Sequence, residues 1–408
     1  MARAPRIAII GGGIGGLAAA LALERRGAEV IVCEQSPALS EIGAGLNLTP
    51  NAVKAFRALG LNDAVEAIGW GSEWLMIRSW RSGRYITRIR RGDFRKTFGA
   101  PNLTVHRADL SDVLQVALKT TELRLGKRCI GADGGDGKTA SARFADGSSI
   151  EADIVIGADG IHSAVRESLF GAETPRFTGC ICWRGMAPVD AVPRDIETAD
   201  GMMWLGPHGH VVHYRVRRGE LVNIVAHIDS DAWTEESWTR ECDVGEVMAA
   251  YAEWNSALTR LYPCSARWYK WALYDREPLQ RWSKGRATLL GDAAHAMLPY
   301  LGQGAAMAVE DGYVLAAMIA RHGDDLDQAL AGYERLRVPR ARATVLGSRA
   351  RAKENHLASP WARFKRNLKL ALRDRLGIDR TAFKVAWLYD YDVAKAVESS
   401  FPAAVGGE

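Results

Sequence analysis

The chain up to Glu34 alternates between apolar and polar stretches in a pattern that predicts a strand, a helix and a second strand. Residues 6–10 are a short apolar run typical of a buried strand, and a glycine-rich turn follows at once at 11–16. Residues 17–26 are rich in Ala and Leu, with charges only at the end, as expected for a helix packed on a sheet. A second apolar run, 28–33, ends at Glu34 and completes a predicted βαβ unit.

The turn has glycine where a bound dinucleotide would need it. Gly11 allows the tight turn, Gly13 removes a side chain where a pyrophosphate must approach the backbone, and Gly16 lets the helix pack on the strand. The helix N-terminus offers unpaired N–H groups to the phosphates. Glu34 can accept hydrogen bonds from ribose hydroxyls and would repel the 2′-phosphate of NADP. The unit therefore predicts a site for NAD or FAD, and its own residues do not choose between them.

Two later segments, 154–166 and 287–311, repeat this design. In each, an apolar run typical of a buried strand leads to an acidic residue, Asp159 or Asp292, ahead of a helix. Ligands collect at this edge of such sheets, where Asp292 can accept hydrogen bonds from ribityl hydroxyls. The small residues 302–306 let backbone approach a flavin ring. The helix that they open would stabilise negative charge on the reduced flavin.

These three segments, in this order and spacing, resemble the fingerprints of the FAD-dependent aromatic hydroxylases. These class A flavoprotein monooxygenases include the salicylate, 3-hydroxybenzoate and 6-hydroxynicotinate monooxygenases. The resemblance covers most of residues 1–345 and implies FAD as the dinucleotide. It extends to the loop 42–48 beside the flavin ring, to 105–110, whose arginine reaches the flavin, and to a strand at 126–129 that passes the adenine. The implied cofactor-binding residues are Gly11, Gly13, Gly16, Glu34, Gln35, Gly45, Asn47, Arg107, Cys129, Asp159, Asp292, Gly302, Gly304 and Ala305.

Asp159 has a second interpretation. In the family this segment is associated with both FAD and reduced nicotinamide, whereas Asp159 and Arg166 could equally form an ion pair that locks the junction of strand and helix. The sequence alone does not decide between the two.

Between the second and third segments the chain changes to alternating apolar and polar positions. Residues 209–216 and 220–227 alternate on either side of a turn, which predicts an antiparallel hairpin, and 71–98 alternate similarly. We therefore predict an α/β protein in which a Rossmann-like FAD-binding domain carries an inserted antiparallel β-sheet substrate domain and is followed by C-terminal helices. The expected ranges are 1–70, 100–175 and 280–345 for the FAD-binding domain, 71–99 and 176–279 for the substrate domain, and 346–408 for the C-terminal helical segment.

The resemblance also implies where the chemistry occurs. His213 stands where the salicylate and 3-hydroxybenzoate enzymes place a catalytic histidine, which can accept the proton of a phenol as the ring is attacked. Tyr300 lies in the segment that forms the pocket ceiling and can hydrogen-bond a substrate oxygen. Asn47 lies beside the flavin, where 6-hydroxynicotinate enzymes carry a histidine, which argues against that substrate. Three unranked candidates to bind a substrate carboxylate are Arg78, Arg184 and Arg215.

The predicted function is a single-component monooxygenase. By resemblance, NADH (or NADPH) binds transiently and reduces FAD, dioxygen adds to give a C4a-hydroperoxyflavin, and a small aromatic hydroxy acid is hydroxylated. Three alternatives stay open. One is an enzyme of the same fold that acts on a larger quinolone, terpenoid or antibiotic. The others are a flavoprotein oxidase or dehydrogenase and a non-catalytic FAD-dependent regulator.

Composition and charge limit the partners and the cellular compartment that we expect for the protein. The net charge of +5 is spread over 408 residues, without a Lys/Arg run interleaved with aromatic residues, which argues against nucleic-acid binding. Six cysteines are too sparse for a disulfide framework, and no second Cys/His pair lies at zinc spacing. We therefore expect a cytoplasmic protein with free thiols and no metal. No apolar run reaches the roughly 18 residues of a membrane span.

A basic amphipathic pattern lies near the C-terminus, at 361–380. Trp361, Phe364, Leu368 and Leu372 recur at steps of three and four residues, as on one side of a helix. We expect this helix to cover the FAD-binding domain or to form the seam of a homodimer. The alternative is a helix on a membrane surface.

Overall fold

The computed structural model describes residues 3–39, 44–230, 240–377 and 384–400. Residues 42 and 43 of the predicted flavin loop, 378–380 of the predicted amphipathic segment and 401–408 at the end of the predicted C-terminal segment lie outside this part of the chain.

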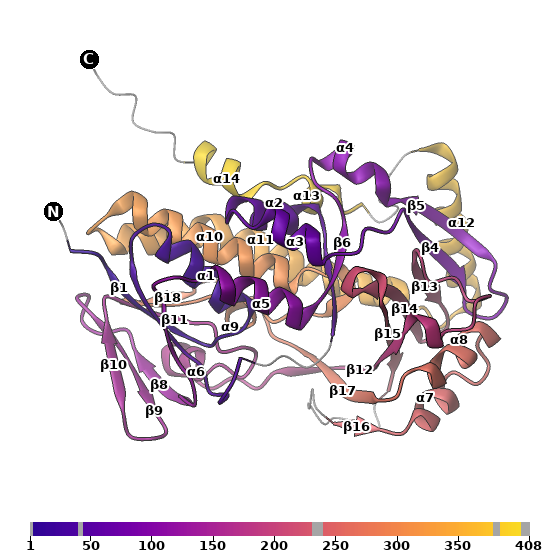
Figure 1. Cartoon of the computed structure of the whole chain (residues 1–408), viewed down its shortest axis with the longest axis horizontal. Coiled ribbons are helices and arrows are strands. Elements are labelled where there is room, and N and C mark those ends of the chain that lie inside the picture. Colours follow the sequence, from indigo (N-terminus) through magenta and orange to yellow (C-terminus); the bar gives the residue numbers. More distant parts are fainter. Residues whose placement is uncertain (1–2, 40–43, 231–239, 378–383, 401–408) are drawn as a thin grey trace, which may run out of the picture.

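A mostly parallel sheet of order β18-β19-β11-β1-β2-β7 occupies the left-hand side of Figure 1. The central strand β1 runs parallel to β11 and β2, and β19 and β7 extend the sheet in the same direction, whereas β18 is antiparallel. The strands are β1 (Arg6–Ile10), β2 (Glu29–Cys33), β7 (Glu122–Arg124), β11 (Ile154–Gly157), β18 (Ser283–Lys284) and β19 (Ala287–Leu289). The carboxyl ends of parallel strands in such a sheet form the edge where dinucleotides bind.

An antiparallel sheet of order β16-β17-β12-β15-β14-β13-β4-β5 occupies the right-hand side. Its one parallel pair among the described strands is β13 with β4. The strands are β4 (Trp74–Ser79), β5 (Tyr85–Arg90), β12 (Arg176–Pro188), β13 (Gly201–Leu205), β14 (Gly209–Val216), β15 (Leu221–Asp229), β16 (Glu241–Cys242) and β17 (Trp268–Asp275). The predicted hairpin is β14 and β15, joined by the short helix η3 (Arg217–Gly219). The predicted fold class is thus confirmed.

The two faces of the antiparallel sheet have different neighbours. The inner face, which carries Cys182 and Val225, packs against Leu298 and against Ala352 of α11 (Leu326–Asn355), and so faces the FAD-binding domain. The outer face, which carries Trp183, is covered by α7 (Val244–Ala250) and α8 (Ser256–Leu261). Because side chains alternate along a strand, each position of the sheet belongs to one face or the other.

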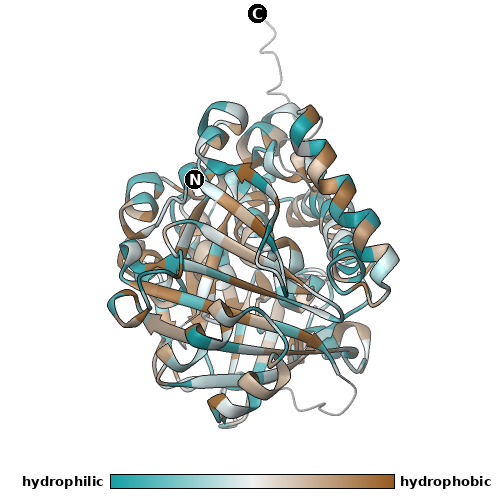
Figure 2. Ribbon diagram, turned by 90° about the vertical axis from the view of Figure 1, so that its right-hand side faces the viewer, coloured by the Kyte–Doolittle hydropathy of each residue, from teal (hydrophilic) through white to brown (hydrophobic). Residues whose placement is uncertain are grey.

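The C-terminal segment differs from the prediction in two ways. The expected boundary at 345 falls inside α11, which continues as one helix to Asn355. α12 (Pro360–Leu376) does not cover the FAD-binding domain, because its buried residue Leu370 packs with Ile77 and Phe94 beside the edge strand β5. Figure 2 shows α12 on the outside of the molecule, at the right. In the described residues, no helix is both long enough and apolar enough to cross a membrane.

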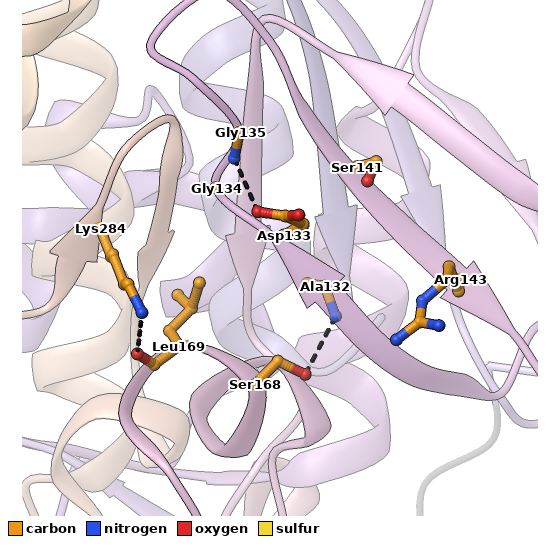
Figure 3. A pocket seen from close by; sticks show the side chains of 9 residues that line it. All are labelled: Ala132, Asp133, Gly134, Gly135, Ser141, Arg143, Ser168, Leu169 and Lys284. Carbon is orange, nitrogen blue, oxygen red and sulfur yellow. Dashed lines mark hydrogen bonds between the residues drawn. The ribbon is translucent and has the colours of Figure 1, made fainter.

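The remaining described strands form two smaller sheets. One pairs β3 (Gly45–Leu48) with β6 (Leu103–His106), and the other consists of β8 (Cys129–Asp133), β9 (Ala140–Phe144) and β10 (Ser149–Ala152). A surface pocket of about 570 Å³ lies beside β8 and β9 (Figure 3). Its polar groups are partly engaged, since Lys284 donates to the carbonyl of Leu169 and Ser168 accepts from the N–H of Ala132. Its lining includes none of the predicted site residues.

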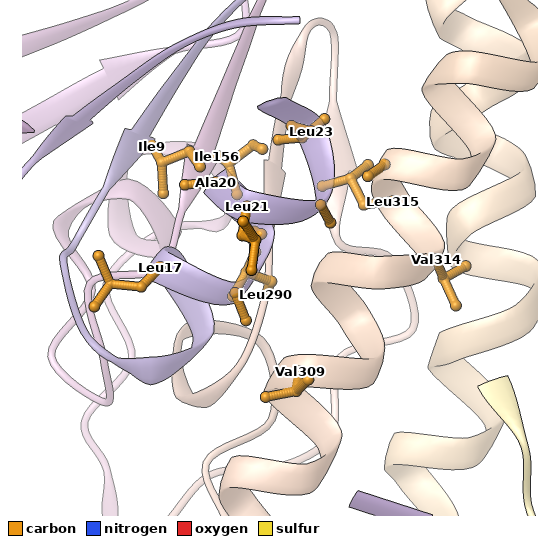
Figure 4. Close-up of a cluster of buried hydrophobic side chains, with 14 of the residues drawn as sticks. Ile9, Leu17, Ala20, Leu21, Leu23, Ile156, Leu290, Val309, Val314 and Leu315 are labelled. Atoms are coloured by element: carbon orange, nitrogen blue, oxygen red, sulfur yellow. The ribbon is translucent and has the colours of Figure 1, made fainter. Parts of the chain in front are cut away.

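The core of the FAD-binding domain depends on a close contact between α1 (Ile14–Glu24) and α10 (Gly304–His322). A Cβ at Gly312 of α10 would lie 2.8 Å from the backbone nitrogen of Ala19, so only glycine allows this approach. Leu17, Leu290 and their neighbours fill the space between the helices and the sheet (Figure 4).

The remaining helices are α2 (Pro50–Ala58), α3 (Asn62–Ile68), α4 (Phe94–Phe98), α5 (Arg107–Ala117), α6 (Ala164–Phe170), α9 (Asp292–His295), α13 (Ala386–Tyr389) and α14 (Val393–Ser400). Short 3-10 turns are η1 (Arg91–Asp93), η2 (Val189–Ala191), η4 (Tyr262–Cys264) and η5 (Pro299–Leu301). Of these, α9 and η5 connect β19 to α10 in the chain.

Candidate active site

Glycines shape the turn after β1. Gly11 has a φ of +112°, and a Cβ there would lie 2.3 Å from the carbonyl oxygen of Ala158. A Cβ at Gly16 would lie 2.0 Å from the carbonyl oxygen of Gly11. Gly13 differs, because a Cβ there would meet no described atom within 4 Å, and α1 begins next to it without a side-chain cap from the described residues. The N–H groups of α1 thus face open space, as a pyrophosphate site requires.

Glu34 lies beside this turn and holds its shape. One carboxylate oxygen accepts from the N–H of Gly12 at 2.7 Å and the other from the N–H of Ser36 at 2.8 Å. The side chain is half-buried, whereas the neighbouring Gln35 is exposed. Each carboxylate oxygen has a second lone pair, so the fixed group can still accept from ribose hydroxyls.

The start of α10 is the second open helix N-terminus. Gly302, with a φ of +62°, turns the chain into α10, and within the described chain the N-cap residue Gln303 makes no side-chain cap. A Cβ at Gly304 would meet no described atom within 4 Å, whereas one at Gly302 would lie 3.3 Å from Nδ2 of Asn47. The structure therefore brings Asn47 of β3 next to a helix N-terminus that suits the anionic edge of a flavin.

Four further predicted cofactor residues lie on the surrounding elements. Asp292 opens α9 after β19, and its side chain is exposed. Arg107 opens α5, is half-buried and donates its N–H to the carbonyl of Ala44 at 2.8 Å. Ala305 is half-buried in the first turn of α10. Cys129 on β8 is half-buried too, and burial raises the pKa of its thiol to about 11, so it stays neutral.

Asp159 has a structural role that the sequence left open. Its carboxylate accepts from the hydroxyl of Ser163 and from the N–H of Val165, so it caps the start of α6. Burial raises the pKa of this carboxyl group. Among the described residues Asp159 forms no ion pair with Arg166, because Arg166 pairs with Glu173 instead.

A buried group of charges lies behind the start of α10. Arg337 of α11 donates to both Glu310 and Asp311 of α10 at 2.7 Å. Arg340 also donates to Glu310 at 2.7 Å, and His295 of α9 lies 2.6 Å from Asp311. Burial alone would raise the pKa of Asp311, but the charges of His295 and Arg337 outweigh it and lower the pKa to about 2. These contacts hold α9, α10 and α11 together.

The inner face of the antiparallel sheet meets the flavin loop at Gly45. Asn223 of β15 accepts from the N–H of Gly45 at 3.0 Å. A Cβ at Gly45 would lie 2.8 Å from the ring of Tyr214 on β14, so this ring also reaches the loop. Burial raises the pKa of Tyr214 to about 12, which keeps its hydroxyl protonated. Asn223 was not expected in the site.

Of the three candidate arginines for a substrate carboxylate, Arg184 is the one on the inner face. Its strand β12 pairs it with Val225, and its guanidinium lies over the ring of Trp271 at 4.7 Å from the centroid. Burial lowers the pKa of its guanidinium. Arg78 and Arg215 lie on the outer face, each bonded to a side chain there.

Imidazole rings gather on the inner face beside Tyr300. His210 and His227 stack with centroids 4.5 Å apart, and each lies 5.3 Å from the ring of Tyr300. Nδ1 of His210 lies 2.9 Å from Nε2 of His356, at the end of α11, and Nδ1 of His356 hydrogen-bonds Asp229. Asp229 is exposed, so hydrogen bonds run in sequence from the buried His210 to the surface.

This arrangement decides which nitrogen of His210 is available. The carboxylate of Asp229 can only accept, so Nδ1 of His356 donates to it, and Nε2 of His356 accepts from Nδ1 of His210. Nε2 of His210 is left as a proton acceptor. Burial, together with the neighbouring His227 and His356, holds the pKa of His210 well below its usual value, so the ring is neutral and Nε2 keeps its lone pair.

Tyr300 lies at this cluster, but its hydroxyl is occupied, because it donates to Sγ of Cys180 at 3.1 Å. Cys180, Asp229 and His356 bring possible metal-ligand atoms within 4.8 Å of one another. This group could not be predicted from the sequence, because its members lie far apart in the chain. Hydrogen bonds to Tyr300 and within the group account for its geometry.

The expectation for His213 needs correction. Strand alternation on β14 turns His213 to the outer face, away from His210 and Tyr214. There it is buried against Trp204, whose indole N–H donates to Nε2 at 3.1 Å. Burial, reinforced by Arg78, lowers the pKa of His213 to about 3. The imidazole of β14 that faces the FAD-binding domain is therefore His210.

A dinucleotide cradle with two open helix N-termini, closed by the inner face of an antiparallel sheet, defines a flavoprotein. Residues 5–348 match the family model described as "FAD binding domain". The chain belongs to the family of FAD-dependent aromatic monooxygenases and binds FAD.

Individual relatives fit this family. The chain is 40% identical over 392 residues to 3-amino-4-hydroxybenzoate 2-monooxygenase PtnB3 of Streptomyces platensis, covering 96% of this chain and 97% of that protein. It is 36% identical to 6-hydroxynicotinate 3-monooxygenase of Pseudomonas fluorescens, over 84% of this chain and 89% of that one. A solved salicylate hydroxylase substrate complex is similar with a TM-score of 0.82 at 28% identity, covering 99% of both chains.

Proposed function

We propose that the protein uses NADH and dioxygen to hydroxylate a small aromatic hydroxy acid. The observation that carries this proposal is the inner face beside the flavin loop, which combines the half-buried guanidinium of Arg184 with the buried imidazole of His210. The cation suits a carboxylate, and the imidazole suits the proton of a ring hydroxyl. The names of the relatives support this class, since hydroxynicotinate, aminohydroxybenzoate and salicylate each combine a carboxylate with a ring hydroxyl.

We assign the FAD contacts to groups around the two open helix N-termini. The N–H groups of α1 at Gly13 would hold the pyrophosphate, and Glu34 the ribose. Asp292 would accept from the ribityl chain, and α10 at Gly304 would face the anionic edge of the flavin. The other proposed cofactor-binding residues are Gly11, Gly16, Gln35, Gly45, Asn47, Arg107, Cys129, Asp159, Gly302 and Ala305.

When bound, FAD supplies the electron transfer and oxygen activation. The chain orients the acid, excludes water and moves one proton. Arg184 binds the carboxylate, and Nε2 of His210 takes the proton of the ring hydroxyl. The proton on Nδ1 of His210 then passes to His356, which passes its own toward Asp229 at the surface. Removal of the phenolic proton makes the ring a stronger nucleophile. Tyr300 positions the imidazoles through its ring contacts, and Asn47 borders the flavin.

We also infer a cytoplasmic setting and a homodimer. All six cysteines are free thiols, which fits a reducing compartment. The homodimer stays a prediction, which light scattering on the full chain would test.

Turnover with NADH, dioxygen and a panel of hydroxybenzoates and aminohydroxybenzoates tests the proposed function. We expect one or more acids to stimulate NADH oxidation and to yield a product heavier by one oxygen atom, detected by mass spectrometry. Peroxide as the only product with every acid would contradict the proposal and favour an oxidase. Hydroxylation confined to a larger quinolone, terpenoid or antibiotic would contradict the substrate class alone.

A further inference from the structure

α12 exposes a row of large apolar side chains. Trp361, Phe364, Leu368, Leu372 and Leu376 are between 46% and 67% exposed. Their spacing of three and four residues places them on one side of the helix, where alternating apolar and polar bands are visible in Figure 2. A contiguous row of this kind on a protein surface marks an interaction site.

The other side of α12 holds the helix in place, so the row has a fixed direction. Leu370 is 6% exposed and packs with Ile77 and Phe94. The guanidinium of Arg366 donates to the carbonyls of Glu354 and Asn355 at 3.0 and 3.1 Å. The apolar row therefore cannot turn inward without breaking these contacts.

The charge of α12 decides between its potential partners. The helix carries six basic residues and one acidic residue, Asp374. Lys365, Lys369 and Arg375 are exposed beside the apolar row, with Nζ of Lys365 5.0 Å from the ring centroid of Trp361. A two-fold contact between copies would place two helices of like charge together, which is unfavourable. An anionic surface complements the same pattern.

We propose that α12 binds the surface of a bilayer that contains anionic phospholipids. The 17-residue helix, about 26 Å long, would lie in the plane of the headgroups, with its apolar row entering about 5–10 Å. Its basic side chains meet the lipid phosphates. The rings of Trp361 and Phe364, stacked at 5.4 Å between centroids, form an aromatic end suited to the interface. This role is independent of the hydroxylation.

Vesicle flotation with the FAD-loaded full chain tests the proposal. We expect the protein to float with vesicles of phosphatidylcholine and phosphatidylglycerol, to bind pure phosphatidylcholine far less, and to be released by added salt. A variant that combines Trp361→Gln, Phe364→Gln and Leu368→Gln should bind about tenfold more weakly or worse, because it loses the apolar contact. Because these side chains are exposed, its melting temperature should stay near that of the parent.

The matched control combines Val116→Gln and Ile130→Gln, which remove apolar side chains that are 72% and 52% exposed on other elements. This control should bind as the parent does. No flotation with phosphatidylglycerol vesicles at low salt would overturn the proposal, as would equal binding by the triple variant. A dimer in light scattering that the triple variant converts to a monomer would also overturn it, since the row would then be a contact between copies.

Discussion

Replacing Arg337 with methionine is expected to lower the free energy of unfolding by about 3–5 kcal/mol. The guanidinium is fully buried and donates to Glu310 and Asp311, which are both 0% exposed. Methionine is also long and flexible, but it removes the cation that the two buried carboxylates share. Glu310 then keeps Arg340 and Asn51 as partners, and Asp311 keeps His295 and the N–H of Gly291. Urea unfolding of the FAD-loaded protein measures this loss.

The matched control is Arg260→Met, which breaks an exposed pair with Asp195. Its loss should be far smaller, because water solvates both charges when the pair is broken. Equal losses for the two variants would contradict the structural role of the buried group.

The same substitution should change the response to acid. The pKa of Asp311 is about 2 in the folded protein, below the ordinary value of 3.8. The ionised carboxylate therefore stabilises the fold fully above pH 3.8, and this stabilisation is lost as the pH falls toward 2. Without Arg337 the pKa of Asp311 rises. Acid unfolding of the Arg337→Met variant, followed by tryptophan fluorescence, should therefore begin at a higher pH than in the parent.

The dinucleotide cradle could be predicted because its requirements are local. The positive φ of Gly11 and the hydrogen bond from the N–H of Gly12 to Glu34 both depend on residues within one short βαβ unit. The start of α10 is similar, since Gly302 and Gly304 provide the turn and the open N-terminus within a few residues. Patterns of glycine and apolar positions report such local geometry directly.

The substrate side could not be predicted in the same way. Side chains alternate between the two faces of a strand, so His213 lies on the opposite face of the sheet from His210 and Tyr214. Which of these two faces is outer depends on α7 and α8, which cover it and are distant in the sequence. The contact of His210 with His356 joins residues that are 146 positions apart, and no local pattern encodes it. The buried partners of Asp311 are likewise contributed by other helices.

Replacing His210 with glutamine is expected to slow hydroxylation by about 10²–10⁴-fold and to leave FAD bound. The side chain lies on the inner face and has Nε2 free to accept once Nδ1 donates to His356. Glutamine retains a polar group but cannot take the proton at neutral pH. Reduction of the flavin does not need this base, so NADH oxidation should continue with peroxide release. The ratio of hydroxylated product to NADH consumed measures the effect.

The matched control is His213→Gln, the same change three residues along β14 but on the outer face. It should leave the product ratio close to that of the parent, because His213 bonds Trp204 away from the flavin loop. Asp229→Asn should give an intermediate loss that added imidazole buffer partly restores, since Asp229 passes the proton on and does not take it from the substrate. A folded His213→Gln variant that loses hydroxylation while His210→Gln retains it would reverse the assignment. The catalytic base would then be His213, the residue that the family resemblance implies, and not the histidine on the inner face of the sheet.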